Sequence, residues 1–293
     1  MKYIYYPGCS LEGTAAEYSI STMAVLGALG VELVELDDWT CCGATAAEGI
    51  SHLLSFALPA RNIAVAEKMK LNCDILVPCS ACYLNLKRVE HETGLDPSLL
   101  KKVNQVLETE SLVLKGKLKT RHLLDVLASD IPISDIASRV TQPLDGLRIA
   151  PYYGCQCLRP YAVFDDPEDP VSMEPIISAL GASVYEWDMG GRCCGASLMS
   201  TAPDAGIELV AGLLEAAQDA DAVVTVCPMC QMNLEAYQKR ASRKRQMHYD
   251  IPVLYLPQLM GLTMGLPDDQ VRMDLNLCVP EAFRNKLMAR QTA

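Results

Sequence analysis

Ten of the thirteen cysteines fall into two sets of five that share one order of motifs. In each set a Gly-Cys pair comes first, a Cys-Cys-Gly-Ala segment follows, and a Cys-x-x-Cys motif closes the set. Thiolates of this kind are ligands for zinc and for iron–sulfur clusters. A chain of 293 residues can fill a core without covalent staples, so we predict metal ligands rather than disulfides. The predicted ligands are Cys9, Cys41, Cys42, Cys79 and Cys82 in the first set, and Cys155, Cys193, Cys194, Cys227 and Cys230 in the second.

The number of cysteines in each set favours a cluster over a single ion. A structural zinc ion takes four ligands in a tetrahedron, and five matching cysteines exceed that number in both sets. We therefore predict iron–sulfur clusters in at least one half of the chain. Structural zinc remains the alternative.

The other potential ligands do not share this repeated spacing. Cys157 is near enough to Cys155 to replace it, but Gly154-Cys155 matches Gly8-Cys9, which favours Cys155 as the ligand. Free cysteines are often small buried residues, as we expect for Cys73 and Cys278. Structural or exposed positions are predicted for the four histidines, which are His52, His91, His122 and His248.

Each cysteine group of the first half follows a predicted strand. The strands span residues 2–6, 32–36 and 75–78, with helices predicted over 14–29 and from about 46 to 71, the second broken at Pro59. Alternating strands and helices imply a parallel sheet with crossover connections. Since sites form at the carboxyl ends of such strands, the five cysteines are expected to converge there.

The second half repeats this order at an offset of 146 to 152 residues. Strands are predicted over residues 147–152, 183–187 and 221–226, the last directly before Cys227. This duplication predicts an α/β fold of two similar lobes, residues 1–143 and 144–293, each a small parallel sheet with crossover helices. Residues 83–127 are predicted to be helical, 129–143 to be the polar boundary, and 251–265 to add a final strand and helix to the second lobe. No element is assigned after Leu266.

Two local features explain how the cysteines reach one site. Adjacent residues of a strand point to opposite sides, so Gly43 and Gly195 are predicted to bend the backbone after each cysteine pair. A Cys-x-x-Cys that opens a helix turns both sulfurs one way, and Pro228 suits such a first turn.

Composition limits the classes of function. The 25 Lys and Arg against 36 Asp and Glu give a formal charge of −11, which argues against nucleic-acid binding. The amino terminus lacks the pattern of a secretory signal, and no apolar run approaches the ~20 residues of a membrane span, so we expect a cytoplasmic protein. There is no Gly-x-Gly-x-x-Gly after a strand and no phosphate loop, so a redox role requires a partner.

Several segments resemble the cysteine-rich family with two CCG motifs, and within it the catalytic B subunit of archaeal heterodisulfide reductase. The resemblance covers nearly the whole chain. The succinate, lactate and glycolate oxidoreductase groups contain related subunits. The matching segments are Tyr6-Pro7-Gly8-Cys9-Ser10, Tyr152-Tyr153-Gly154-Cys155 with Arg159-Pro160, and both Cys-Cys-Gly-Ala segments.

The resemblance implies that each cysteine set holds a non-cubane [4Fe-4S] cluster, and that the coenzyme M–coenzyme B heterodisulfide binds between the lobes. It also implies a ferredoxin-like C subunit and a flavin-containing A subunit as partners, often with a hydrogenase or formate dehydrogenase. Because reducing a disulfide takes two electrons, we hypothesise that each cluster donates one electron. Arg159 and Arg192 are candidates for binding the anionic substrate. The alternatives are an electron-relay subunit of a hydroxyacid or succinate oxidoreductase, and a zinc-stabilised interaction module.

Overall fold

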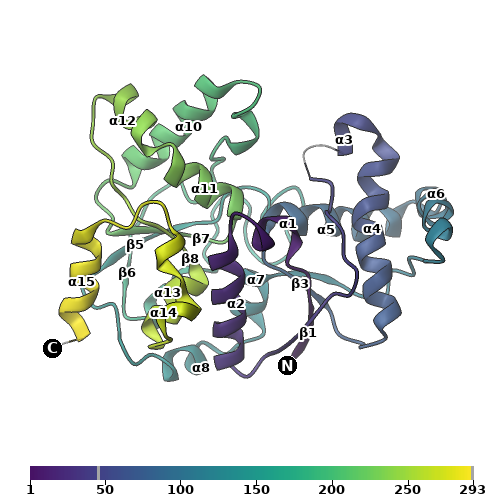
Figure 1. Cartoon of the computed structure of the whole chain (residues 1–293), viewed down its shortest axis with the longest axis horizontal. Coiled ribbons are helices and arrows are strands. Elements are labelled where there is room, and N and C mark those ends of the chain that lie inside the picture. Colours follow the sequence, from purple (N-terminus) through teal and green to yellow (C-terminus); the bar gives the residue numbers. More distant parts are fainter. Residues whose placement is uncertain (45–46, 292–293) are drawn as a thin grey trace.

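The structure is a computed structural model that describes residues 1–44 and 47–291, and it contains two parallel four-stranded sheets (Figure 1). Both sheets have the same strand order, β2-β1-β3-β4 in the first and β6-β5-β7-β8 in the second. This agreement confirms the predicted α/β fold with a duplicated architecture. The strands are β1 Lys2–Tyr5, β2 Glu32–Glu35, β3 Ile75–Val77, β4 Thr120–His122, β5 Arg148–Tyr152, β6 Ser183–Val184, β7 Ala222–Thr225 and β8 Val253–Tyr255.

Strand β4 lies where the sequence predicts only helices. Its three residues, Thr-Arg-His, show no apolar alternation, so nothing local favours a strand. The strand forms because it pairs with β3, Ile75 opposite Thr120 and Val77 opposite His122. Tertiary pairing therefore overrides local pattern here. Around it lie α5 Ser80–Leu95, α6 Pro97–Leu107, the 3-10 turn Glu108–Glu110, α7 Leu123–Ser129 and α8 Ile133–Ser138.

The long helix predicted from about Ala46 to Leu71 breaks at Ser51, not at Pro59. Ala46 itself lies outside the described residues. The chain forms α3 Ala47–Ile50 and α4 His52–Met69, with Pro59 buried inside α4. Ser51 is extended, and its Oγ accepts a hydrogen bond from Leu54 N at 3.4 Å, so a new helix begins after it. The prediction of a break at Pro59 was wrong, because the face that α4 buries holds the helix together despite the lost backbone hydrogen bond.

The remaining helices complete the two lobes. The helix predicted over 14–29 is confirmed as α2, preceded by the short α1, while the second strand of the second lobe is shorter than predicted. After β6 the chain turns, and Trp187 Nε1 donates to the Pro151 carbonyl at 3.0 Å. These helices are α1 Gly8–Glu12, α2 Ala16–Ala28, α9 Glu174–Ala179, α10 Pro203–Ala216, α11 Pro228–Ala236, α12 Gln238–Arg245, α13 Leu256–Thr263, α14 Asp268–Val271 and α15 Glu281–Gln291, with 3-10 turns at Ala196–Leu198 and Met273–Leu275.

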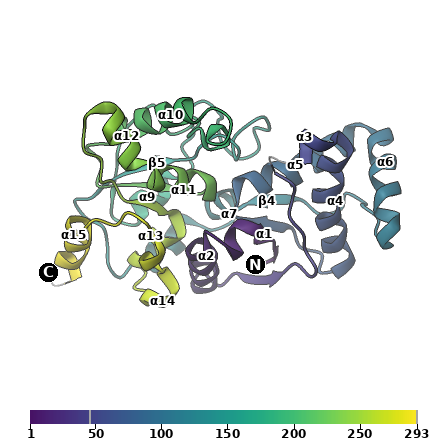
Figure 2. The ribbon, with the colours of Figure 1, turned by 45° about the horizontal axis from the view of Figure 1, so that its top comes forward.

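One hydrophobic cluster extends across both halves, and a second, smaller cluster lies within the second half. The final strand and helix predicted over 251–265 are confirmed as β8 and α13, but α13 also packs against α2 of the first half. Figure 1 shows α2 beside α13 and α14 at the centre, and Figure 2 shows α6 and α15 at opposite ends of the molecule. Buried Leu26 and Met260 belong to one hydrophobic cluster. Within the described ranges, no helix combines the length and hydropathy required to cross a bilayer.

Candidate metal centres

The first cysteine set converges at the carboxyl ends of β1, β2 and β3. Cys9 Sγ lies 3.9 Å from Cys41 Sγ, and Cys42 Sγ lies 3.3 Å from Cys82 Sγ. Cys79, directly after β3 and Pro78, is the N-cap of α5 and hydrogen-bonds with Cys82. All five predicted sulfurs are therefore connected through contacts between neighbours.

The second set repeats this arrangement at the ends of β5, β6 and β7. Cys194 Sγ lies 3.5 Å from Cys230 Sγ, and Cys155 hydrogen-bonds with Cys193. Cys227 caps α11 as Cys79 caps α5. The structure thus brings together each group of five that the sequence predicts.

Glycine makes room for the sulfurs in both lobes. Gly8 and Gly154 have φ of +69° and +70°, in the left-handed region that favours glycine. A Cβ at Gly8 would lie 2.9 Å from Cys82 Sγ, and one at Gly154 would lie 2.9 Å from Cys230 Sγ. The Gly-Cys pair therefore lets the backbone pass directly against a sulfur of the Cys-x-x-Cys motif.

The bend after each cysteine pair occurs where predicted. Gly43 and Gly195 have φ of +77° and +75°. Gly43 N donates to Cys41 Sγ at 3.4 Å, and Gly195 N donates to Cys193 Sγ at 3.3 Å. The bend thus turns one sulfur back onto a backbone N–H while the next residue is buried.

Side chains outside the cysteine motifs hold the two bends in matching ways. Asn85 Nδ2 donates to the Cys42 carbonyl at 3.1 Å, and Asn233 Nδ2 donates to the Cys194 carbonyl at 2.7 Å. The hydroxyls of Tyr6 and Tyr152 each donate at 2.8 Å to the carbonyl just before the cysteine pair. These four residues were assigned no role in the site from the sequence, although their equal positions in both copies were the available signal.

Each set contains a thiol whose pKa is lowered by its neighbours. Hydrogen bonds from Cys41 and then Cys82 lower the pKa of Cys42 to about 3. In the second set, the hydrogen bond from Cys155 lowers the pKa of Cys193 to about 6, with smaller help from Gly195 N and Arg159. Since the thiolate is the metal ligand, both sites contain at least one group prepared to bind metal.

The donor chemistry of the two sets fits iron–sulfur clusters. Among the described residues, no three Cys, His, Asp or Glu side chains are grouped to hold one metal ion. Neighbouring sulfurs contact one another in each lobe, and seven of the ten cysteines are buried or half-buried. An all-thiolate set suits iron–sulfur clusters, which Cys9, Cys41, Cys42, Cys79 and Cys82 would hold in one lobe and Cys155, Cys193, Cys194, Cys227 and Cys230 in the other.

The cysteines and histidines outside the sets lie elsewhere. Cys157 is buried and donates to the Tyr153 carbonyl at 3.2 Å, whereas Cys155 bonds Cys193. Cys73 and Cys278 are half-buried, less covered than predicted, and the Cys278 thiol donates to the carboxylate of Asp250 at 3.2 Å. Of the histidines, His122 is buried and His52, His91 and His248 are exposed.

The two arginines proposed for substrate have different surroundings. Arg159 donates to the carbonyls of Pro167 and Gly191 and pairs with Glu168 at 3.3 Å, so its charge is already engaged. Arg192 is exposed next to exposed Cys193. Arg192 is therefore the better placed of the two to meet an anionic ligand.

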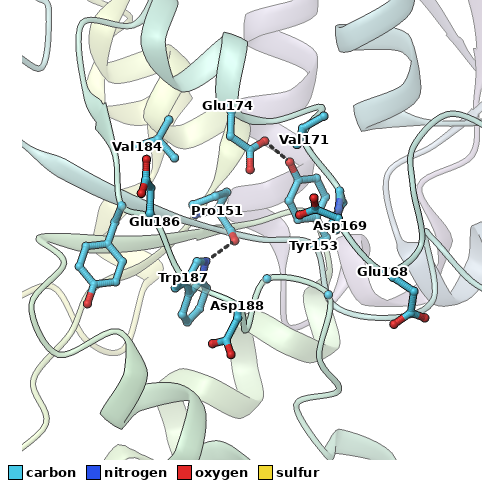
Figure 3. A pocket seen from close by; sticks show the side chains of 14 residues that line it. Pro151, Tyr153, Glu168, Asp169, Val171, Glu174, Val184, Glu186, Trp187 and Asp188 are labelled. Carbon is cyan, nitrogen blue, oxygen red and sulfur yellow. Dashed lines mark hydrogen bonds between the residues drawn. The ribbon is translucent and has the colours of Figure 1, made fainter.

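A cavity of about 400 Å³ lies behind the loop that leads to Cys193 (Figure 3). Trp187 bonds the Pro151 carbonyl at its floor, and the Tyr153 hydroxyl donates to Glu174 across it. Carboxylates of one charge repel anions, so this cavity does not suit an anionic substrate. The acidic residues that line it are Glu168, Asp169, Glu174, Glu186 and Asp188.

The fold and the two thiol sites together define a duplicated cysteine-rich protein. The chain belongs to the CCG family, whose model, described as "Cysteine-rich domain", matches residues 3–87 and 149–235. Both matched segments contain one complete five-cysteine set.

Relatives over most of the chain are redox proteins by name. The membrane anchor subunit of 8-methylmenaquinol:fumarate reductase from Wolinella succinogenes is 35% identical, covering 94% of this chain and 96% of its own. A protein from Archaeoglobus profundus named as similar to the B subunit of heterodisulfide reductase is 30% identical over 92% and 93%. The B subunit of a ferredoxin/F420H2-dependent CoB-CoM heterodisulfide reductase from Methanosarcina acetivorans is 28% identical over 92% of each. These similarities support an iron–sulfur redox subunit.

A solved structure shares the fold. The crystal structure of a hypothetical protein from Helicobacter pylori superposes with a TM-score of 0.77 over 95% of this chain and 52% of that one. At 16% sequence identity this similarity shows the fold alone.

Proposed function

We propose that this chain is the catalytic subunit of a heterodisulfide reductase, reducing the coenzyme M–coenzyme B disulfide to two thiols with electrons from partner subunits. The observation that carries the proposal is the proximity of two matching thiol sites. Ser80 Oγ, next to Cys79, donates to the carbonyl of Val226, next to Cys227, at 3.1 Å. Two one-electron centres this near each other suit a reaction that consumes an electron pair.

The residues of this chain would hold the clusters, bind the substrate and orient the loop beside it. Each five-thiol set would hold one non-cubane [4Fe-4S] cluster, which supplies single electrons when bound. Arg192 would bind an anionic group of the substrate through charge-assisted hydrogen bonds. Arg159 would act as a positioning residue, because it ties the loop at Gly191 to the segment around Pro167.

The proposed partners are a ferredoxin-like C subunit and a flavin-containing A subunit, in some complexes with a hydrogenase or formate dehydrogenase, in the cytoplasm. The similarity to B subunits of heterodisulfide reductases supports this assignment. Residues 143 and 144 remain the proposed boundary between the lobes.

The direct test is dye-driven reduction of the heterodisulfide by anaerobically purified protein with measured iron and acid-labile sulfide. We expect turnover, and a raised KM in Arg192→Ala with kcat less affected, because ground-state binding is weakened. Arg139→Ala is the matched control, since Arg139 is exposed after α8 at a distance in sequence from every predicted ligand. Iron-loaded protein without turnover would contradict the proposal.

A second function is favoured by the similarity to the fumarate reductase subunit, at 35% identity. In that case the chain would relay electrons between a quinol and a succinate or fumarate flavoprotein, without contacting a disulfide. Iron-loaded protein that fails the heterodisulfide assay but restores quinol-dependent fumarate reduction to a flavoprotein partner would favour this function. Colourless protein that contains only zinc would favour a zinc-stabilised interaction module.

A further inference from the structure

A single tyrosine hydroxyl contacts the backbone that leads into both Cys-x-x-Cys motifs. Tyr18 on α2 is fully buried, and its hydroxyl lies 3.0 Å from the Pro78 carbonyl and 3.1 Å from the Val226 carbonyl. Pro78 directly precedes Cys79, and Val226 directly precedes Cys227. One oxygen atom therefore stands between the two cysteine sites, in a part of the core that other residues seal from solvent.

Aromatic stacking fixes the position of this hydroxyl. The Tyr18 ring stacks on Tyr255 of the second lobe, with centroids 4.1 Å apart and an angle of 3° between planes. The corresponding residue of the second copy, at the 146-residue offset, is Phe164, which stacks on His122 of the first lobe at 6.0 Å and 2°. The contact is reciprocal, but Phe164 has no hydroxyl. At this position, therefore, only the first copy contributes a hydroxyl that links the two lobes.

A second link to the Val226 carbonyl passes through His122 and Ser80 of the first lobe. His122 Nδ1 accepts from Leu124 N at 3.2 Å, so the neutral ring carries its proton on Nε2. Nε2 lies 3.2 Å from Ser80 Oγ and donates to it. The Ser80 proton is then directed to the Val226 carbonyl at 3.1 Å. The carbonyl before Cys227 is therefore contacted by two hydroxyls of the first lobe, those of Tyr18 and Ser80.

We propose that the Tyr18 hydroxyl couples the two cysteine sites, by fixing the backbone before Cys79 and Cys227 and by providing a hydrogen-bonded path for electrons between them. This inference rests on the proposal that both sets hold iron–sulfur clusters, and it does not depend on which substrate they reduce. In each transfer one electron leaves the reduced site and enters the oxidised one. No covalent bond forms or breaks, and Tyr18 keeps its proton. The electrons come from the reductant that charges the first site.

The test variant is Tyr18→Phe, which places the residue of the second copy in the first and keeps the stacked ring. Tyr5→Phe is the matched control, because Tyr5 is also buried in the same lobe and its hydroxyl bonds Ser19 Oγ at 2.9 Å instead of the carbonyl before either motif. Iron content and thermal unfolding are measured first for each protein. The proteins are then reduced stepwise without oxygen and examined by electron paramagnetic resonance for magnetic interaction between the two sites.

We expect the exchange part of this interaction, which is carried through bonds and hydrogen bonds, to be several-fold weaker in Tyr18→Phe than in the wild type, and Tyr5→Phe to keep the wild-type value. If Tyr18→Phe takes up less iron, Ser80→Ala, which removes only the second link, should give a smaller decrease at full iron content. An unchanged interaction in both Tyr18→Phe and Ser80→Ala would overturn the inference and leave the proposed function standing. A wild-type protein with iron in neither lobe would overturn both.

Discussion

The two lobes agree closely around the sulfurs and differ in what surrounds them. In both, glycine lies against a Cys-x-x-Cys sulfur, and a tyrosine and an asparagine hold the bend of the cysteine pair. Beyond that shell they diverge. Cys9 lies in α1 and is exposed, whereas Cys155 is half-buried in an irregular segment that extends to α9.

The comparison separates the features that would bind a metal group from those that would bring a ligand or the other lobe to it. The features repeated in both lobes are those that position the cysteine sulfurs, so both sites require the same arrangement of sulfurs. The features found in one lobe only bring charge or contact: Arg159 and Arg192 correspond to Gly13 and Thr40 in the first copy. The second lobe therefore has an exposed cation, Arg192, beside its cysteine pair, and the first lobe has the longer helix α2, which packs against α13 of the second.

The largest effect is expected from removing one buried ligand in each lobe. Cys42→Ser and Cys194→Ser should each lower iron and sulfide content by about half, because each residue belongs to a different five-thiol set. Cys73→Ser is the control, since Cys73 lies outside both sets. Loss of all iron from either ligand variant would show that the sites do not assemble independently, and would break the comparison between lobes.

A smaller loss is expected from Gly8→Ala and Gly154→Ala. The left-handed backbone costs alanine about 1–2 kcal/mol, and the new methyl group would also press on a ligand sulfur at 2.9 Å. Iron content and the unfolding temperature should both fall. Gly116→Ala isolates the backbone effect, because Gly116 has φ of +66° and nothing within 4 Å of the added methyl group. Equal behaviour of all three variants would contradict a role for the close sulfur contact.

Acid should weaken the first lobe through His122. Burial lowers the pKa of His122 to about 3, so below its ordinary value of 6.5 only the unfolded chain takes up the proton. Stability is therefore retained above pH 6.5 and decreases as pH falls toward 3, by at most roughly 1.4 kcal/mol per pH unit for this group.

Urea unfolding at pH 7.5 and 5.5 measures this effect. Between these pH values the free energy of unfolding should decrease less in His122→Gln than in the wild type. In Tyr255→Phe, at the matching position of the second lobe, it should decrease as much as in the wild type. Identical slopes for His122→Gln and the wild type would rule out His122 as the source.

The smallest effect is expected from Tyr6→Phe and Tyr152→Phe. Each removes one hydrogen bond to the carbonyl before a cysteine pair, worth about 1 kcal/mol, or about 2–4 °C in Tm. Calorimetry of both variants would sharpen the comparison, because equal decreases are expected from matching bonds. A lower Tm in only one variant would show that the two hydrogen bonds differ in energy although their geometry matches.

Much of the site could be predicted because its determinants are local. Strand ends followed by cysteines, glycines after the cysteine pairs and an internal repeat are visible in the sequence, and the structure places all ten cysteines accordingly. Strand β4 was not predictable in this way, because Thr120, Arg121 and His122 become a strand only through pairing with β3. Ser51 replaced Pro59 as the helix break because capping and packing outweighed a missing N–H.

The contacts between lobes were invisible for a different reason. Tyr18 and Phe164 occupy equal positions in the repeat. Tyr255 and His122 are the last residues of the matching strands β8 and β4, opposite Thr225 and Val77. The residue types differ, so comparison of the copies does not mark them. The pairing of Tyr18 with Tyr255 depends on how α2 lies against α13, which no single segment specifies.

The crossed stacking of Tyr18 on Tyr255 and of Phe164 on His122 has a consequence for the origin of the chain. When position i of one unit meets j of the other, and j of the first meets i of the second, the surface is isologous, as in a twofold dimer. The chain thus has the form of a dimer whose two halves have been joined end to end. Because both copies belong to one chain, they can differ at matching positions, and here a hydroxyl is present in one stacked pair at Tyr18 and absent in the other at Phe164.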